Sequence, residues 1–192
     1  MASDARGPEA GGPDMDGTED DGDATADARP KDPMASISGH ITVLSTGERA
    51  MLRRMYLTRT MSAEGVVVKL LAYAGVPVPH EPAGFAPWKL IAHSAALLAG
   101  TAGQAAHARG KSLGDALQAA GYSENRLLRL CAARSDALQD QIVRAVRVLA
   151  QAGKGPVNLW TLFHLAGRDG VAAEEARLRI ARDYYAARAA AN

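Results

Sequence analysis

The stretch that decides the fold is residues 135–152, SDALQDQIVRAVRVLAQA. Its large apolar side chains recur every three or four residues: Leu138, Ile142, Val146 and Leu149. That spacing is the period of an α-helix with one buried face. On an ideal helical wheel, Arg144 and Arg147 fall on the opposite side, about 160° to 240° from Leu138. The stretch therefore predicts a helix that adds to a core on one side and presents cations on the other.

Signals for the start of a helix repeat at short intervals along the rest of the chain. Ser45 with Glu48, and Ser112 with Asp115, have the spacing of capping boxes, and Pro87 suits a first helical position. Further capping candidates are Gly121, Ser123, Ser135 and Asn158. Together these signals predict helices over residues 46–59, 63–74, 87–98, 112–120, 123–133, 135–152, 158–166 and 172–190.

The fold class predicted from this pattern is all-α. Alanine, leucine and arginine dominate, and β-branched runs are rare outside residues 66–68. Prolines in residues 75–84 and glycines in residues 100–111 predict loops, since proline lacks an amide hydrogen and biases the residue before it toward extended backbone. We expect a compact helical bundle of about eight short helices.

The charge of the chain is divided unevenly between two segments. Residues 1–36 carry ten acidic and three basic side chains, a net charge of −7, whereas residues 37–192 carry a net charge of +8. The first segment has almost no large apolar side chains and cannot offset its backbone entropy by burial, so we expect a disordered acidic tail. Residues 37–192 have the length of one domain, and their basic balance favours a polyanionic partner.

The sequence lacks the motifs that are typical of several functional classes. Cys131 is the only cysteine, which excludes an internal disulfide and a multi-cysteine zinc site, and its Leu-rich surroundings predict an inert, packed thiol. No phosphate-binding loop, zinc-protease motif or run of about 18 apolar residues is found. The histidines are scattered: His40, His80, His93, His107 and His164. We therefore expect a non-catalytic cytoplasmic protein without cofactor, metal, membrane span or small-molecule substrate.

Arginines lie on neighbouring turns of three predicted helices, with few acids beside them. An ordinary solvated face usually interleaves acids with bases, and this remains the simpler interpretation of any single arginine. Arginine also suits phosphate, because its planar fork donates two hydrogen bonds to one group. The pattern favours binding to a nucleic-acid backbone, but it contains no base-reading motif.

Short ordered motifs from about residue 45 to residue 188 resemble CasB, the small subunit of the type I-E CRISPR complex Cascade. The most specific is residues 111–117, KSLGDAL, which is similar to the family's Ser-Leu-Gly-x-Ala-Leu element. The others are LRR at 52–54, the helix at 124–134, QIVR at 141–144, VNL at 157–159 and RDYY at 182–185. Where many relatives carry tryptophan in the late helices, this chain has Phe163, His164 and Leu165, and Ile180 and Ala181. The acidic tail has no counterpart in the family pattern.

The resemblance implies a non-catalytic subunit that is present in two copies beside other Cascade subunits. It would contact guide RNA and target DNA without sequence preference and stabilise the R-loop. The candidate phosphate-binding residues are Arg53, Arg54, Lys111, Arg126, Arg129, Arg144, Arg147 and Arg168. Arg177, Arg179 and Arg182 are instead candidates for facing a neighbouring subunit.

Two alternatives to this function stay open at the level of sequence. One is a free-standing helical adaptor whose basic faces bind an acidic protein, and a weaker one is a DNA-binding regulator. For the tail, we hypothesise competition with nucleic acid for the basic faces. The alternatives are a solubility segment or a start site at Met34.

Overall fold

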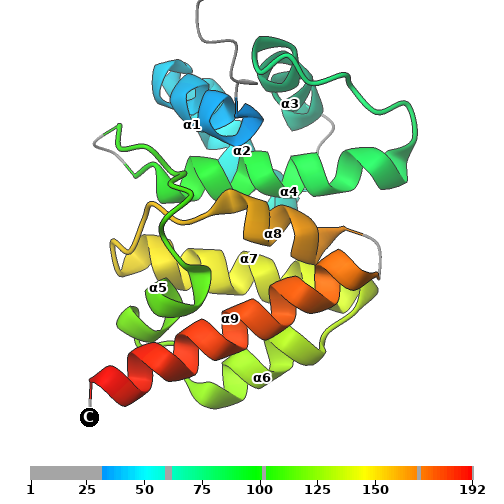
Figure 1. Cartoon of the computed structure of the whole chain (residues 1–192). Helices are drawn as coiled ribbons and strands as arrows, with labels where there is room; N and C mark the ends of the chain where they lie inside the picture. The colour runs from blue at the N-terminus through cyan, green and yellow to red at the C-terminus, as the bar shows by residue number, and fades with distance from the viewer. Residues whose placement is uncertain (1–31, 59–61, 101–102, 168–169, 192) are drawn as a thin grey trace, which may run out of the picture.

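The computed structural model describes residues 32–58, 62–100, 103–167 and 170–191 (Figure 1). Within them the chain forms nine α-helices: α1 Pro33–Val43, α2 Thr46–Thr58, α3 Ser62–Tyr73, α4 Pro82–Leu98, α5 Leu113–Ala119, α6 Glu124–Ala132, α7 Ser135–Gln151, α8 Leu159–Ala166 and α9 Val171–Ala190. Extended pairing in these ranges is confined to one isolated parallel bridge, between His107 and Val157. The predicted all-α class is confirmed.

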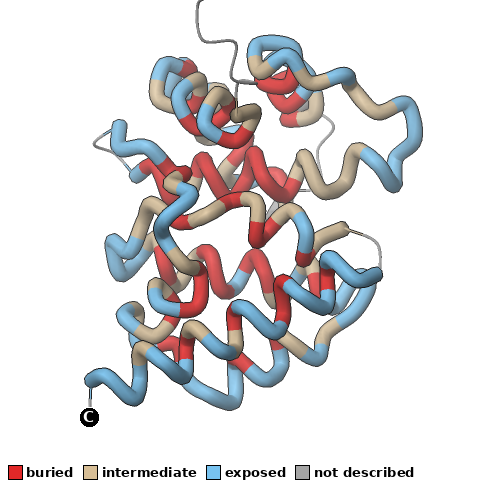
Figure 2. The backbone as a smooth tube through the Cα atoms, viewed as in Figure 1, coloured by how far each residue is buried: buried red, intermediate tan, exposed pale blue. Residues whose placement is uncertain are grey.

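Helix α4 lies across the middle of the molecule and joins its two ends (Figure 1). On one side it packs against α1, α2 and α3, and on the other against α7 and α8. Helices α5, α6 and α9 complete the far end, where α5 packs along α9. Buried side chains run continuously through both ends (Figure 2), so the described residues share one hydrophobic core.

Helix α1 was not predicted from the sequence. It begins inside the segment assigned to the tail, where the Asp32 carboxylate accepts a hydrogen bond of 3.0 Å from the Met34 amide. Met34, Ile37 and Ile41 are buried in the core, which extends the folded part four residues before the predicted boundary at residue 36. Its start signals, an Asp N-cap and a Pro, were hidden among the acids and prolines before them. Residues 1–31 of the predicted disordered tail lie outside the described residues.

Two predicted helix starts are also wrong. Helix α4 begins at Pro82 rather than Pro87, so Pro87 lies inside the helix, near its N-terminal end. Pro87 lacks the amide that would bond to the Ala83 carbonyl oxygen, and this cost falls within the first two turns of the helix. Ser135 is the first residue of α7 rather than its N-cap, which is Arg134, and Ser135 has a left-handed φ of 51°.

Other local predictions are confirmed. The Ser45 and Glu48 box forms in both directions: the Ser45 amide donates to Glu48 Oε2 at 3.0 Å, and the Glu48 amide donates to Ser45 Oγ at 3.2 Å. Asn158 Oδ1 caps α8 through the Trp160 amide at 3.1 Å. Half of the second box forms, since the Asp115 amide donates to Ser112 Oγ at 3.4 Å, and Ser112 Oγ in turn donates to Asp183 of α9 at 2.7 Å. That contact helps to fix α5 on α9.

Candidate nucleic-acid interface

A groove between α6 and α7 holds four of the predicted arginines. Its volume is about 400 Å³. It is lined by Tyr122, Arg126, Arg129, Gln141, Arg144, Arg147 and Val148. Two helices that are consecutive in the chain thus bring their basic sides together in one concave surface.

The amphipathic pattern of each helix places these arginines. In α6, Leu127 and Leu130 are buried, so Arg126 and Arg129, one turn apart, remain exposed. In α7 the apolar side chains predicted to pack are buried: Leu138, Ile142, Val146 and Leu149. Arg144 is exposed, and Arg147, which also lines the groove, is half-buried. The wheel analysis of residues 135–152 is confirmed for the buried side and for Arg144.

The four groove arginines make no hydrogen bond or ion pair with other described residues. Many other cations of the described ranges are paired: Lys69 with Glu48, Lys89 with Glu64, Arg109 with Asp32, Arg134 and Arg177 with Glu174, Arg182 with Asp183, and Arg188 with Glu124. Like charges so close together repel one another unless an anion lies between them. The groove is therefore a site of concentrated, uncompensated positive charge.

Tyr122 lines the groove and connects it to the rest of the fold. The residue is only 2% exposed, and its carbonyl oxygen accepts a hydrogen bond of 2.6 Å from the Tyr184 hydroxyl of α9. Burial raises the pKa of the Tyr122 phenol, while the charges of Arg126 and Arg144 act in the opposite direction. The phenol is thus a neutral group beside two cations, and it supports an anion site without opposing its charge.

The charge of Arg147 also acts on a polar group in the core. Its positive charge adds to the desolvation that lowers the pKa of His93 to about 4. His93 of α4 is fully buried, and its Nδ1 lies 2.8 Å from the Leu52 carbonyl oxygen. His93 is therefore neutral at physiological pH and adds no charge to the groove.

Arg53 and Arg54 line a different hollow, of about 380 Å³, at the N-terminal part of α2. The Arg53 guanidinium donates hydrogen bonds of 2.8 Å to the carbonyl oxygens of Ala96 and Gly100, at the end of α4. Arg54 donates to the Ala50 carbonyl oxygen at 3.3 Å. Arg53 thus satisfies carbonyls that the end of a helix leaves without partners. Sequence reasoning had no signal for this contact, since the residues are more than forty positions apart.

The remaining candidates lie elsewhere. Lys111 is exposed in the loop before α5, outside both hollows, and Arg168 lies outside the described residues. Arg177, expected to face a neighbouring subunit, is 4% exposed and pairs with Glu174 at 2.9 Å. Sequence reasoning also missed the groove positions of Tyr122 and Gln141, because neither is charged.

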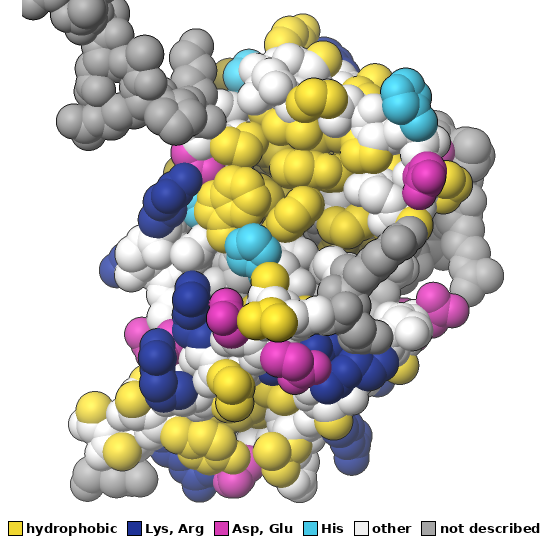
Figure 3. All heavy atoms as spheres, turned by 45° about the vertical axis from the view of Figure 1, so that its right-hand side comes forward, with side chains coloured by type: hydrophobic (Ala, Val, Ile, Leu, Met, Phe, Trp, Pro, Cys, Tyr) yellow, Lys and Arg dark blue, Asp and Glu magenta, His cyan; other side chains and the backbone are white. Residues whose placement is uncertain are grey.

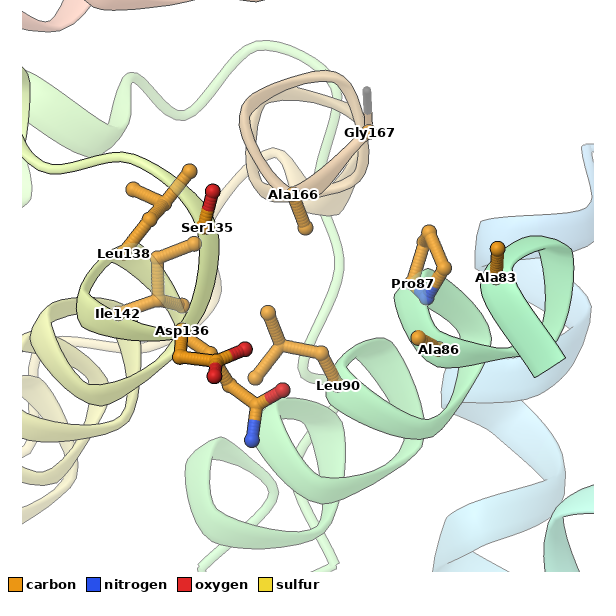
Figure 4. Close-up of a pocket in the computed structure, with 11 residues that line it drawn as sticks. Ala83, Ala86, Pro87, Leu90, Ser135, Asp136, Leu138, Ile142, Ala166 and Gly167 are labelled. Atoms are coloured by element: carbon orange, nitrogen blue, oxygen red, sulfur yellow. The ribbon is translucent and has the colours of Figure 1, made fainter. Parts of the chain in front are cut away.

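A third hollow, of about 500 Å³, lies between α4, α7 and α8 (Figure 4). Apolar side chains such as Pro87, Leu90 and Ala166 line it, with Asp136 as its charged residue, so it does not suit a polyanion. Figure 3 shows a broad apolar area on the upper part of one face of the molecule, with Lys and Arg interspersed with Asp and Glu below it. The arginine-lined groove and this apolar hollow thus share no lining residue.

We searched the described residues for a reactive cysteine, a metal site and a membrane-spanning helix. Burial raises the pKa of the half-buried Cys131 thiol, as expected for a packed cysteine. In the described ranges, no group of three or more His, Cys, Asp or Glu side chains is placed to hold a metal ion. None of the helices described is long and apolar enough to cross a membrane.

Comparison with protein families matches residues 48–185 to the family described as CRISPR-associated protein Cse2 (CRISPR_cse2). The match begins in α2 and ends in α9, and so includes the groove. Comparisons with curated proteins and with solved structures gave no match. Members of this family, also called CasB, are structural components of Cascade and associate with its other subunits. The chain belongs to the Cse2 (CasB) family, the small subunits of the type I-E CRISPR Cascade complex.

Proposed function

We propose that the α6–α7 groove binds the phosphate backbone of nucleic acid within a cytoplasmic Cascade complex and thereby stabilises the R-loop. One observation carries this proposal: four guanidinium groups from two helices line one groove, and none of them has a partner among the described residues. A concave surface with this charge attracts a polyanion and orients it. The groove is also formed by helices that belong to the region matched to the family.

The chemistry of the groove suits backbone contacts rather than base recognition. Each guanidinium can donate two hydrogen bonds to one phosphate, which gives affinity and register but no sequence information. Guide pairing supplies the sequence specificity of an RNA-guided complex. Because exchanging a DNA duplex for an RNA–DNA heteroduplex is almost balanced in free energy, a few phosphate contacts are enough to favour the open state. We expect guide RNA and target DNA as ligands, and two copies of the chain per complex.

The decisive experiment removes two groove charges from the full chain. Arg126→Ala with Arg144→Ala should weaken binding to every DNA or RNA sequence alike, measured by fluorescence anisotropy over a salt series. The slope of log affinity against log salt should become flatter by about 1.4 to 1.8, at about 0.7 to 0.9 per phosphate contact. In reconstituted Cascade, the same variant should lower the fraction of target DNA that is opened.

The matched control is Lys69→Ala with Lys89→Ala, which removes two cations from ion pairs on α3 and α4. It should leave the salt slope unchanged. If both double variants change the slope equally, net charge rather than the groove determines binding, and the proposal is wrong.

Membership of the Cse2 family, whose proteins are subunits of Cascade, removes the main support for the alternative of a free-standing adaptor. Binding of the unmodified chain to an acidic protein with no affinity for nucleic acid would restore that alternative.

A further inference from the structure

No acidic residue lines the groove, but the N-terminal segment of the chain carries a surplus of acids. Residues 1–31 hold nine acidic and three basic side chains, a net charge of −6. Four of the acids stand within five positions: Glu19, Asp20, Asp21 and Asp23. A guanidinium binds a carboxylate by the same two-pronged hydrogen bonding that it uses for a phosphate. This cluster therefore has the charge and the donor–acceptor chemistry to occupy the groove.

The point at which the acidic segment joins the domain is firmly held. Asp32 Oδ2 accepts a hydrogen bond of 2.6 Å from Arg109 Nε, and Asp32 Oδ1 accepts one of 3.1 Å from Trp160 Nε1. Partial burial opposes ionisation of Asp32, but these bonds and the Met34 amide outweigh it and lower its pKa to about 2. The Asp32 carboxylate is thus already engaged in hydrogen bonds within the domain. The nine acids before it are the ones that could pair with the groove arginines.

The length of the segment allows it to reach the groove. A chain of this length can span up to about 100 Å when extended, at about 3.3 Å per residue. A domain of this size has a radius of gyration of about 15 Å. The acids at residues 19–23 stand 9 to 13 residues before Asp32, so they can reach about 30 to 43 Å from it, a distance comparable with the diameter of the domain.

We propose that the acidic residues of segment 1–31 occupy the α6–α7 arginine groove and compete there with nucleic acid. This inference rests on the proposed function and adds a regulatory step to it. In the free subunit the segment neutralises the groove and suppresses binding to unrelated nucleic acid. In the assembled complex, guide RNA or target DNA carries the higher charge density and displaces the segment.

The size of the effect follows from the tethering. A tethered group has an effective concentration on the order of 1 mM at a site that it can reach. Non-specific electrostatic binding has a Kd of about 0.1 mM at physiological salt. The ratio of these values predicts that the segment weakens binding of nucleic acid by about tenfold.

The test keeps the full chain and neutralises the segment. In the neutral variant, serine replaces Asp14, Asp16, Glu19, Asp20, Asp21 and Asp23, which leaves Asp4, Glu9 and Asp27 against Arg6, Arg29 and Lys31. Binding of a fluorescein-labelled oligothymidine is measured at low salt for this variant and for the unmodified chain. The neutral variant should bind about tenfold more tightly, and the difference should disappear at about 0.5 M salt, where the Debye length is only a few ångströms. A chain with the same residues 1–31 in scrambled order should behave like the unmodified one, since the effect depends on charge.

A double-mutant cycle separates occupation of the groove from a general effect of net charge. With Arg126→Ala and Arg144→Ala in both chains, neutralising the segment should no longer tighten binding. If the same tenfold gain persists in that background, the segment does not act through the groove and the proposal is overturned. Equal affinities of the two chains with the intact groove would overturn it as well, while leaving groove binding of nucleic acid established.

A second measurement needs no nucleic acid and so distinguishes failure of this inference from failure of the proposed function. Amide chemical shifts of the full chain are compared by NMR before and after neutralisation of the segment. Shift changes concentrated in α6 and α7 that disappear with added salt would support occupation of the groove, even if neither chain binds oligothymidine. Unchanged shifts in α6 and α7 would overturn it.

Discussion

Gly114 of α5 lies so close to Tyr184 of α9 that a Cβ atom at position 114 would be 2.7 Å from the Tyr184 amide nitrogen. It would also collide with the Ile180 carbonyl oxygen and lie 2.9 Å from Asp183 Cβ. Two of these three atoms belong to the backbone of α9, which cannot move aside as the end of a side chain can. The glycine of the family-like motif at residues 111–117 is therefore required by helix packing.

Gly114→Ala should destabilise the domain, because either α5 or α9 must shift to admit the methyl group. We expect a loss of about 3 kcal/mol or more, at the upper end of overpacking effects. For a chain of this length that loss lowers Tm by roughly 6 to 12 °C in thermal unfolding followed by circular dichroism.

Gly65→Ala on α3 is the matched control for that measurement, because nothing lies within 4 Å of the added Cβ atom. It should leave Tm unchanged or raise it slightly, since alanine favours a helix by about 1 kcal/mol over glycine. Equal Tm values for the two variants would contradict the close packing of α5 on α9.

Arg53 and Arg126 should respond differently to truncation, although the sequence assigned both to phosphate binding. Arg53→Ala removes two charge-assisted hydrogen bonds to α4 carbonyl oxygens, and we expect it to cost about 1 to 2 kcal/mol in urea unfolding, after allowance for the half-exposed position. Arg126→Ala should change stability by less than about 0.5 kcal/mol, and should affect nucleic-acid affinity instead. A stable Arg53→Ala variant with a flatter salt slope would place Arg53 among the phosphate contacts.

His93 should make stability depend on pH in mildly acidic solution. Its pKa is about 4 in the folded chain against 6.5 for an ordinary histidine, so the unfolded chain takes up its proton first. Stability from this residue is complete above pH 6.5 and falls as pH decreases toward 4, by about 3 kcal/mol in total. Urea unfolding of the wild type and of His93→Gln across this range measures the difference. The same pH slope in both chains would show that His93 is not the titrating group.

Asp32 should contribute to stability in two separable ways. Asp32→Ala removes the cap of α1 and the acceptor of Trp160, and should cost about 1 kcal/mol or slightly more. Asp32→Asn keeps one oxygen that can accept from both the Met34 amide and Trp160 Nε1, and loses only the Oδ2 acceptor of Arg109, so it should lose less at neutral pH. The lowered pKa of Asp32, about 2, means that wild-type stability declines as pH falls from about 4 toward 2, and this decline should be weaker in Asp32→Asn. Equal losses in both variants at neutral pH would assign the effect to charge rather than capping.

Local sequence was sufficient for the fold class and for most helices. The period of apolar residues in residues 135–152 and in α6 correctly predicts which side is buried, since that period depends only on helix geometry. The caps at Ser45 and Asn158 depend on neighbouring residues and are equally readable. Helix α1 was missed because its signals stand inside an acidic, proline-containing context that predicts disorder.

Only the tertiary structure separates the candidate arginines by role. Arg126, Arg129, Arg144 and Arg147 line one groove because α6 and α7 follow one another and pack together. Arg53 donates hydrogen bonds to carbonyl oxygens at the end of α4, and Arg177 is buried and paired with Glu174. The local sequence pattern predicts neither the Arg53 contact nor the burial of Arg177. The sequence by itself determined which residues carry charge and which side of each helix is polar. Which charges remain unpaired depended on packing, because hydrogen bonds between distant segments exist only once the helices are in place.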